Sequence, residues 1–589
     1  MMSNKRNVYI IVAAVIIIIG LGGNWYLTEQ RKAERAEELL AEKYEQWVVW
    51  SRTIYIGTIA SDYHPGIAIG RGNRNYLEGY LRGGKLLWVD ANDINIFNPS
   101  LAESWEFKVN SDGEAYVEYK IVQGLKFPDG TDVDAEAVKY TWERERYELA
   151  TREKHGETYH VYSMSTGWKR LEVPDKYTLL QFLPEDNQNF LPHPFSFIHA
   201  LAHSHIVSPE SSETYAKETN AISDFANQVG YGPFLLESFV VDQQSVLVPW
   251  DDYVTLGPTS GTTGPTKVTE LDKVVIIEYA DATSLRMALE RGEVDIVDDT
   301  IADVDYQDLL ANPDIVTDRA PAIGYCMLFH MNHRPEFAPF NDLDFRKAVS
   351  YAIFPEELVE KCLFGLGSVA DSAVRTFQPY YLPVWEEIRS LPDDERIDIA
   401  KDLLAKAGYP DGYSTEIWIP DNIDYRNWAT IVQAQLLKIG IRTTIKSFES
   451  GVYYDEVRAG HAPMFFRGWT LDYNDPDSEL WYLLHSSSDK QAQRMGYNNS
   501  YIDSLLERGK ELYDPTGDPA ERQEIYEEIQ QIMFDDTISI PLMYQDMYQA
   551  WNSWVEDYVM WKTTHTTCMG VWNARKVIPD NWETTDPPR

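Results

Sequence analysis

Cysteine is scarce in this chain, with 3 residues among 589. Cys326, Cys362 and Cys568 lie far apart and show no paired spacing. A disulfide framework or a structural zinc site requires several cysteines, or cysteines and histidines, at short regular intervals. The sequence therefore predicts neither, and we expect the protein to carry no metal and no cofactor.

Basic residues are also few relative to acidic residues. Lys and Arg total 52 against 93 Asp and Glu, which gives a formal net charge of −41 at pH 7. A surface with so negative a field repels the phosphate backbone of DNA and RNA. We therefore expect no nucleic-acid partner.

Sequence motifs of catalytic machinery are absent. The chain contains no nucleophile motif, no P-loop and no zinc-protease helix. The enzymatic alternative that remains is a glycoside hydrolase with a carboxylate pair such as Asp472 and Asp475. We expect that the protein is not an enzyme, because a binding role also accounts for these carboxylates.

One long hydrophobic run is present, near the N-terminus. Lys5 and Arg6 precede an almost uninterrupted apolar stretch over residues 8–21, and Trp25 and Tyr26 follow it. The stretch approaches the roughly 20 residues that a spanning helix needs, and the basic flank predicts a cytoplasmic N-terminus. The sequence therefore predicts a single-pass membrane protein with its binding domain outside the cytoplasm.

We expect residues 1–27 to form a transmembrane anchor. The alternative is a cleaved signal peptide, with Gly20 and Gly22 as the small residues before the cut. Retention is favoured because no A-x-A pattern stands at the end of the run and no cysteine follows it there to accept a lipid. Residues 28–52, rich in Ala, Glu, Lys and Arg, are predicted to form a charged helical spacer.

From Thr53 onward, short apolar runs alternate with amphipathic helical patterns, which is typical of a mixed α/β protein. The length of the chain predicts at least two lobes, each with its own core. Residues 345–353 place their apolar side chains at helical spacing. Another helix is predicted to end before Gly408, in a left-handed cap. A third is predicted to end near Gly292, before a strand that ends near Val297.

Several segments, in order along the chain, resemble motifs of the extracytoplasmic solute-binding proteins of peptide ABC transporters, the oligopeptide- and dipeptide-binding family 5. The similarity spans roughly residues 53–573. The segments that carry it are "PSLAESWEF", "GLKFPDGTDVDAEAVKYTWER", "GYGPFLLESF" with "VPWDDYV", "ALERGEVDIV", "MNHRPEFAPFNDLDFRKAVSYAI", "LLAKAGYPDG", "AQLLKIGIRTTI", "GWTLDYNDPDS" and "ERQEIYEEIQQIM".

The resemblance implies an α/β, two-lobed periplasmic-binding-protein-like fold with a two-strand hinge, preceded here by the N-terminal transmembrane helix. The first lobe is expected to comprise residues 53–324 and to be completed by residues 540–589. The second lobe is expected to comprise residues 325–539. The chain would cross between the lobes near "YCMLFHMN" and "ISIPLMYQ", which are both apolar runs of strand length.

The stretch "GWTLDYNDPDS" contains the predicted ligand site. In the family, the first acidic residue of this loop receives the free α-amino group of a bound peptide, and the resemblance assigns that role to Asp472. An ammonium group carries three donors and no acceptor, so a buried carboxylate binds it by a strong charge-assisted hydrogen bond. Trp469 and Tyr473 could form flat walls of the site, with plain core packing as the alternative for Trp469. Arg467 could bind a carboxylate of the ligand or pair with an acidic neighbour.

The other acidic residues of this stretch receive structural interpretations. Asp475, directly before Pro476, is expected to shape the turn. Asp477 and Glu479 are expected to be solvated surface charges. A calcium site is disfavoured because the spacing departs from the D-x-D/N-x-D/N-G pattern of calcium loops.

A run of histidines, His193, His199, His203 and His205, could place two imidazoles on one helical face. Without a third ligand in view, surface or core roles are favoured. The run nevertheless keeps a metal chelate open as an alternative cargo. An oligosaccharide is another alternative, because stacked aromatic side chains suit sugar rings and the chain has 18 Trp and 37 Tyr.

The leading hypothesis is a membrane-tethered extracytoplasmic receptor that captures peptides and delivers them to an ABC permease. We expect such a receptor to act as a monomer. A surface sensor or adhesin built on the same scaffold is the alternative.

Overall fold

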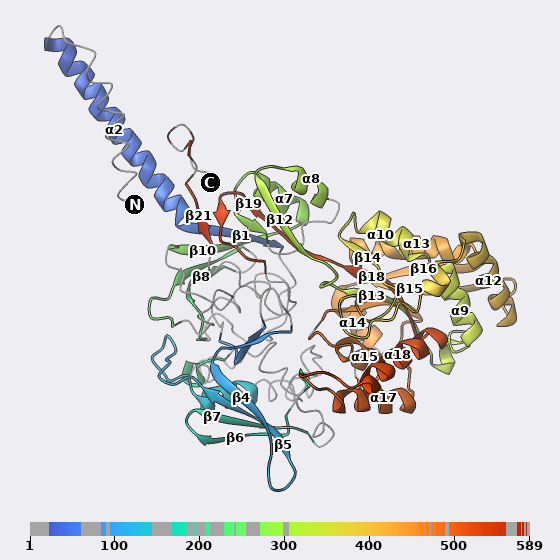
Figure 1. Cartoon of the computed structure of the whole chain (residues 1–589). Helices are drawn as coiled ribbons and strands as arrows, with labels where there is room; N and C mark the ends of the chain where they lie inside the picture. Colours follow the sequence, from blue (N-terminus) through green and yellow to red (C-terminus); the bar gives the residue numbers. More distant parts are fainter. Residues whose placement is uncertain are drawn as a thin grey trace.

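The structure, a computed structural model, describes residues 23–59, 84–89, 95–143, 168–184, 193–194, 206–211, 229–240, 243–254, 271–297, 305–471, 473–488, 494–560, 574–578, 580–581, 583 and 585. Two large β-sheets lie on opposite sides of two adjacent connecting stretches (Figure 1). We call the part built on the seven-stranded and four-stranded sheets the first lobe. The second lobe is the part built on the six-stranded sheet.

The first lobe has a mixed sheet at its centre. β1 (Thr53–Ile59) pairs in parallel with β10 (Lys273–Tyr279) and with β11 (Ile296–Val297). Outside them lie β9 (Gln244–Pro249) and β8 (Phe234–Val240) on one side, and β19 (Met547–Asn552) and β12 (Ile315–Ala320) on the other. The order of the four-stranded antiparallel sheet is β4 (Ala102–Val109), β5 (Ala115–Ile121), β7 (Thr178–Phe182) and β6 (Arg170–Asp175).

Smaller elements complete this lobe. They are the strand pairs β2 (Leu87–Val89) with β3 (Phe97–Pro99) and β20 (Val555–Glu556) with β21 (Arg575–Lys576), and the helices α7 (Ala282–Glu290) and α8 (Tyr306–Ala311).

The second lobe is a six-stranded sheet with helices on both faces. The strand order is β14 (Gly367–Val369), β18 (Ser539–Gln545), β13 (Cys326–Met331), β17 (Met464–Trp469), β15 (Tyr413–Pro420) and β16 (Ile441–Phe448). Its helices are α9 (Leu343–Ala352), α10 (Pro355–Cys362), α11 (Glu386–Arg389), α12 (Asp393–Lys406), α13 (Ile423–Leu437), α14 (Ser450–Arg458), α15 (Asp477–Leu484), α17 (Ser500–Glu511) and α18 (Ala520–Asp535).

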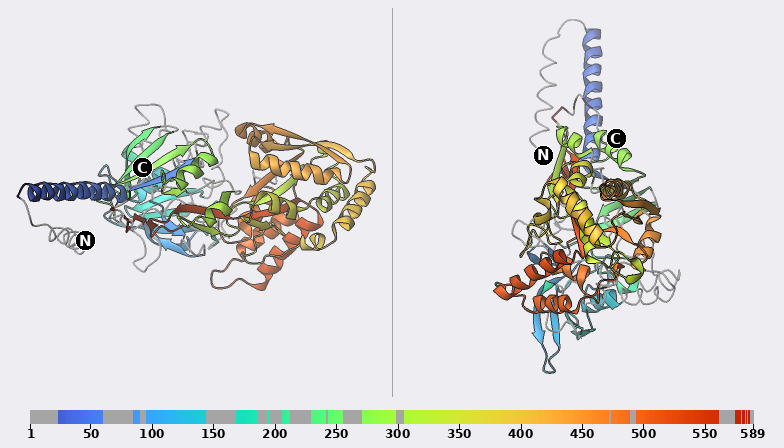
Figure 2. Two further views of the ribbon diagram at one scale, coloured as in Figure 1. Left: turned by 90° about the horizontal axis from the view of Figure 1, so that it is seen from above. Right: turned by 90° about the vertical axis from the view of Figure 1, so that its right-hand side faces the viewer.

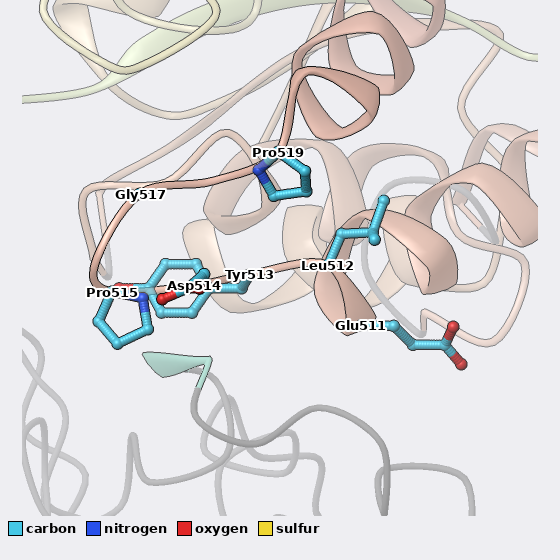
Figure 3. A pocket seen from close by; sticks show the side chains of 7 residues that line it. All are labelled: Glu511, Leu512, Tyr513, Asp514, Pro515, Gly517 and Pro519. Carbon is cyan, nitrogen blue, oxygen red and sulfur yellow. The ribbon is translucent and has the colours of Figure 1, made fainter.

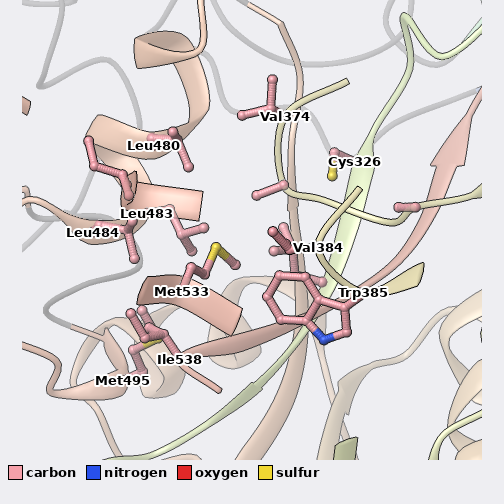
Figure 4. Packing of buried hydrophobic residues seen from close by; sticks show 14 of the residues in the cluster. Cys326, Val374, Val384, Trp385, Leu480, Leu483, Leu484, Met495, Met533 and Ile538 are labelled. Atoms are coloured by element: carbon pink, nitrogen blue, oxygen red, sulfur yellow. The ribbon is translucent and has the colours of Figure 1, made fainter. Parts of the chain in front are cut away.

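Side chains of the central strands alternate between the two faces of this sheet, as the pleat requires. On β13, Met327 and Phe329 pack in a cluster with α9, α12 and α13, whereas Leu328 packs in a cluster with α14, α15, α17 and α18. Figure 4 shows part of the cluster that contains Leu328. Phe465 of β17 belongs to it as well. Arg467 and Trp469, two and four residues further along β17, therefore lie on the face that carries α15 and α18.

The three predicted local patterns are confirmed. α9 buries the apolar face expected within residues 345–353. α12 is followed by Gly408 with a φ of +93°, the left-handed conformation that glycine adopts without strain. α7 ends just before Gly292, and the short strand β11 ends at Val297.

The chain passes between the lobes twice, at residues 321–325 after β12 and at Asp546 after β18. The Gln545 N–H donates to the Tyr325 carbonyl at 2.8 Å. A Cβ on Gly324 would lie 2.8 Å from the Gln545 carbonyl oxygen, so the two crossings approach closely because this position has no side chain.

The position of β18 changes the expected lobe boundary. This strand pairs with β13 inside the six-stranded sheet, so the return to the first lobe occurs at Asp546 and not at residue 540. Ladder hydrogen bonds to β13 and β14 keep β18 in the six-stranded sheet as far as Gln545.

Helix α2 (Gly23–Ser51) contains most of the predicted spacer and projects away from the first lobe (Figure 2). In the part of the chain that the structure describes, no helix combines the length and apolarity that crossing a bilayer demands. The apolar run of residues 8–21 lies outside the described residues, so the anchor stays a prediction.

Candidate functional site

The site loop, residues 469–479, leads from the end of β17 into the first turn of α15. Trp469 still pairs with Cys326 of β13, which fixes the start of the loop. Pro476 directly precedes α15, where its restricted φ suits entry into a helix. The Asp475 carboxylate accepts a hydrogen bond from the Asp477 backbone N–H at 3.0 Å. The turn-shaping role expected for Asp475 is therefore confirmed.

The expectation that Asp477 and Glu479 are solvated is wrong. Asp475, Asp477 and Glu479 are 2%, 0% and 3% exposed. An unpaired carboxylate at such depth would lose several kcal/mol of hydration, so each one needs a buried cation. The three pairs, which we call the buried ionic network, are Asp475 Oδ2 with Arg522 Nη2 at 2.6 Å, Asp477 Oδ2 with Lys510 Nζ at 3.3 Å, and Glu479 with Arg375.

Further polar contacts support these pairs. Arg522 also donates to the Gly509 carbonyl at 2.7 Å and to Asp518 at 2.8 Å. The Lys510 ammonium lies 3.1 Å from the centroid of the Trp481 ring, a cation–π contact. The site loop is thereby attached to α17 and α18, which supply Lys510 and Arg522.

The charge on Asp475 is stabilised by its partners. Burial by itself would raise the pKa of this carboxyl, but the Arg522 guanidinium and the His193 ring outweigh burial and hold the pKa well below its usual range. Burial is also the main reason that the pKa of Tyr473 lies well above its usual value. Tyr473 therefore remains a neutral phenol, and its hydroxyl donates to Asp477 Oδ2 at 2.9 Å.

Arg375 connects the buried ionic network to the first crossing. Its Nε donates to the Ala322 carbonyl at 2.7 Å, and its Nη2 lies 2.9 Å from both the Gly324 and the Trp469 carbonyls. A guanidinium offers five donors in a fixed plane, so one side chain can serve all these acceptors and Glu479. The geometry of the crossing and the start of the site loop are fixed by the same group.

The four predicted ligand residues have different surroundings. Asp472 lies outside the described residues. Trp469 is half-buried and stacks on Tyr482, with ring centroids 4.5 Å apart, so core packing accounts for part of its surface. Tyr473 is 1% exposed and engaged with Asp477. Ligand contact by these residues stays a prediction.

Arg467, the fourth predicted residue, is half-buried on β17. Its guanidinium lies 4.9 Å from the centroid of the Tyr454 ring. Among the described residues no carboxylate pairs with it, and Asp475, Asp477 and Glu479 pair with other cations. Its Nε is buried and has no hydrogen-bond partner in the described chain. Within the described part of the chain, the Arg467 guanidinium therefore binds no anionic side chain.

The histidine run is described only at His193, which is fully buried. His199, His203 and His205 lie outside the described residues. Across the described ranges, no group of three His, Cys, Asp or Glu side chains is arranged to hold a metal ion.

A hollow of about 650 Å³ lies at the connection between α17 and α18 (Figure 3). Its lining comprises Glu511, Leu512, Tyr513, Asp514, Pro515, Gly517 and Pro519. Arg467, Trp469 and Tyr473, the predicted ligand residues that the structure describes, do not line this hollow.

Sequence reasoning missed three residues of this region, Arg375, Lys510 and Arg522, and considered His193 only as a possible metal ligand. Each lies far along the chain from the carboxylate it meets, and local periodicity carries no information on such pairs. A signal was nevertheless present in the density of the acidic stretch itself. Several acids in a stretch that also contains large aromatics indicate burial, which requires cations from elsewhere.

Comparison with known proteins agrees with this architecture. Residues 97–491 match the bacterial extracellular solute-binding proteins, family 5. The chain belongs to this family. Heme-binding protein A of Haemophilus influenzae is 26% identical over 482 residues, which cover 78% of this chain and 81% of that protein. The glutathione-binding protein GsiB of Salmonella paratyphi A is 27% identical over 460 residues, which cover 75% and 80%.

A solved structure shares the fold of this family 5 protein. The periplasmic binding protein DppA of Helicobacter pylori, in complex with the peptide STSA, superimposes with a TM-score of 0.69 at 22% identity. The match covers 89% of this chain and 98% of DppA. The protein is thus a family 5 solute-binding protein associated with ABC transport, with an extracytoplasmic α/β binding domain, and it is not an enzyme.

We predict that Asp477→Asn destabilises the second lobe by about 3 to 5 kcal/mol, because it leaves the buried Lys510 ammonium without its carboxylate charge. Denaturant unfolding followed by tryptophan fluorescence measures the loss. Asp421→Asn is the control, since Asp421 is 72% exposed in its pair with Arg426 and its loss should cost less than about 1 kcal/mol. Equal losses in the two variants would show that the Asp477 pair does not stabilise the site loop.

Proposed function

We propose that this family 5 protein is a membrane-tethered, monomeric receptor that captures peptides outside the cytoplasm and delivers them to an ABC permease. The observation that carries the proposal is the fixation of the site loop by the buried ionic network. Asp472 follows the buried residue Leu471 and precedes the buried Tyr473. Both described neighbours are held in place, and a carboxylate between them would bind an ammonium group at a reduced entropic cost.

The peptide class is supported by the STSA complex of DppA, in addition to the family motif around Asp472. A free α-amino group would bind to Asp472. Arg467, whose guanidinium has no carboxylate partner among the described residues, would bind a carboxylate of the same ligand. Trp469 and Tyr473 would limit the space between these two charges. Heme and glutathione, for which two relatives are named, are alternative ligand classes, as are an oligosaccharide and a metal chelate.

Ligand binding is proposed to close the two lobes on the paired crossings. The crossings are short, adjacent and hydrogen-bonded to each other, which suits a hinge of a few residues. A ligand that contacts both lobes shifts the equilibrium toward the closed arrangement by its differential affinity.

We predict that the N-terminal segment is retained as an anchor. We expect retention because of the basic flank, the apolar run of residues 8–21 and the lack of a following cysteine. Intact-mass analysis of protein extracted from membranes should find residues 1–27 present, and a salt wash should leave the protein bound. Release by salt, or a mature chain that starts after Gly22 or Gly23, would contradict retention.

Asp472→Asn should weaken binding of a free-amino peptide by about 30-fold to several-thousand-fold. The substitution keeps the size of the side chain but removes one charge of a buried pair, at a cost of roughly 2 to 5 kcal/mol. Asp421→Asn again serves as the exposed control and should leave affinity unchanged.

N-acetylation of the peptide distinguishes the proposed contact from an indirect effect. It should weaken binding to the wild type to a similar extent, yet cause little further loss in the Asp472→Asn variant, because both changes delete one interaction. Calorimetric titration of the four combinations measures the coupling. Additive losses would show that Asp472 does not bind the amine.

A further inference from the structure

His193 connects the two lobes at the site loop. It lies in the chain between β7 and β8, which are both strands of the first lobe. Its Nε2 is 3.5 Å from Asp475 Oδ1, and its ring packs edge-on against Tyr473 and Tyr513, with centroids 5.5 Å and 4.9 Å apart. All three of these partners belong to the second lobe. The ring is fully buried, although imidazole is a polar group that water solvates well.

The Asp475 carboxylate is shared between the lobes. One oxygen pairs with Arg522 of α18, and the other faces His193. The Arg522 pair lies wholly within the second lobe and does not depend on where the first lobe sits. The His193 contact, in contrast, joins a residue between two strands of the first lobe to a residue of the second lobe, so we expect separation of the lobes to break it. Asp475 is therefore held in place by one partner and is available to the other when the lobes close.

A second contact between the lobes involves the neighbouring residue of the site loop. Asn474 Nδ2 donates to Asn95 Oδ1 of the first lobe at 2.8 Å. This hydrogen bond is exposed, so water competes for both groups and its contribution is small. The buried contact of His193 is accordingly the one expected to influence closure.

We propose that His193 is a positioning residue for ligand binding, which holds the lobes closed through Asp475 and the two tyrosines. This proposal rests on the proposed function in one respect, that a ligand is enclosed between the lobes. It adds that part of the affinity for the ligand comes from His193, which acts through the site loop. The apparent affinity of a binding protein scales with the fraction of molecules in the competent arrangement, so a contact made only on closure raises affinity for every ligand alike.

The test compares the ligand-free wild type with His193→Leu and His193→Gln by small-angle X-ray scattering. Leu fills a similar volume without a donor, whereas Gln retains an N–H that can reach Asp475. We expect His193→Leu to lower the ratio of closed to open molecules by about 10-fold to 100-fold, and His193→Gln to recover part of it. Asn95→Ala, which removes the exposed contact, should change the ratio by less than about threefold.

Two measurements separate positioning from stability and from ligand identity. The thermal unfolding temperature of His193→Leu should stay close to that of the wild type, because Asp475 keeps its pair with Arg522. Tetra-alanine serves as the probe ligand, and its dissociation rate should rise in His193→Leu by the factor found for the closed fraction.

An unchanged scattering curve in His193→Leu would overturn the proposal. An equal closed fraction in His193→Leu and His193→Gln would also overturn it, because packing alone would then account for the contact. A wild type that does not bind tetra-alanine would count against the peptide class only, since the scattering comparison needs no ligand.

Discussion

Three carboxylates of the site loop are removed from water, and the structure around them follows from the need to compensate their charge. A buried carboxylate without a partner is too costly for a protein whose net stability is about 5 to 15 kcal/mol. Arg375, Lys510 and Arg522 supply the compensation, and each comes from a different part of the second lobe. The loop is thereby attached to the crossing, to α17 and to α18 at once. The position of the site loop is therefore set by buried ion pairs within the second lobe.

This arrangement separates two roles that the acidic stretch combines in sequence. Asp475, Asp477 and Glu479 have their charges satisfied inside the protein, so they are not available to a ligand. Asp472 is the residue to which the family motif assigns the ligand's amino group. On β17, Arg467 has the opposite charge and no described carboxylate partner. A ligand with an amino group and a carboxylate would complement both, which suits a peptide.

The features that could be predicted from the sequence are those that depend on neighbouring residues or on motif order. The helix at residues 345–353 follows from apolar spacing, and the glycine at 408 marks a helix end because of its conformational freedom. The two-lobed fold follows from family motifs in order. Burial of Asp477 and Glu479 could not be predicted in this way, since it depends on cations brought close by the tertiary fold. The partner of Asp475 on α18 lies 47 residues away in sequence.

The identity of the natural ligand decides whether Asp472 and Arg467 bind the termini of a peptide. Protein purified gently from its own cells and then denatured should release its cargo for analysis by mass spectrometry. We expect a mixture of peptides with free amino groups, because the proposed contacts are to the backbone termini and not to one side chain. A single sugar, a heme or a metal chelate as the released species would contradict it.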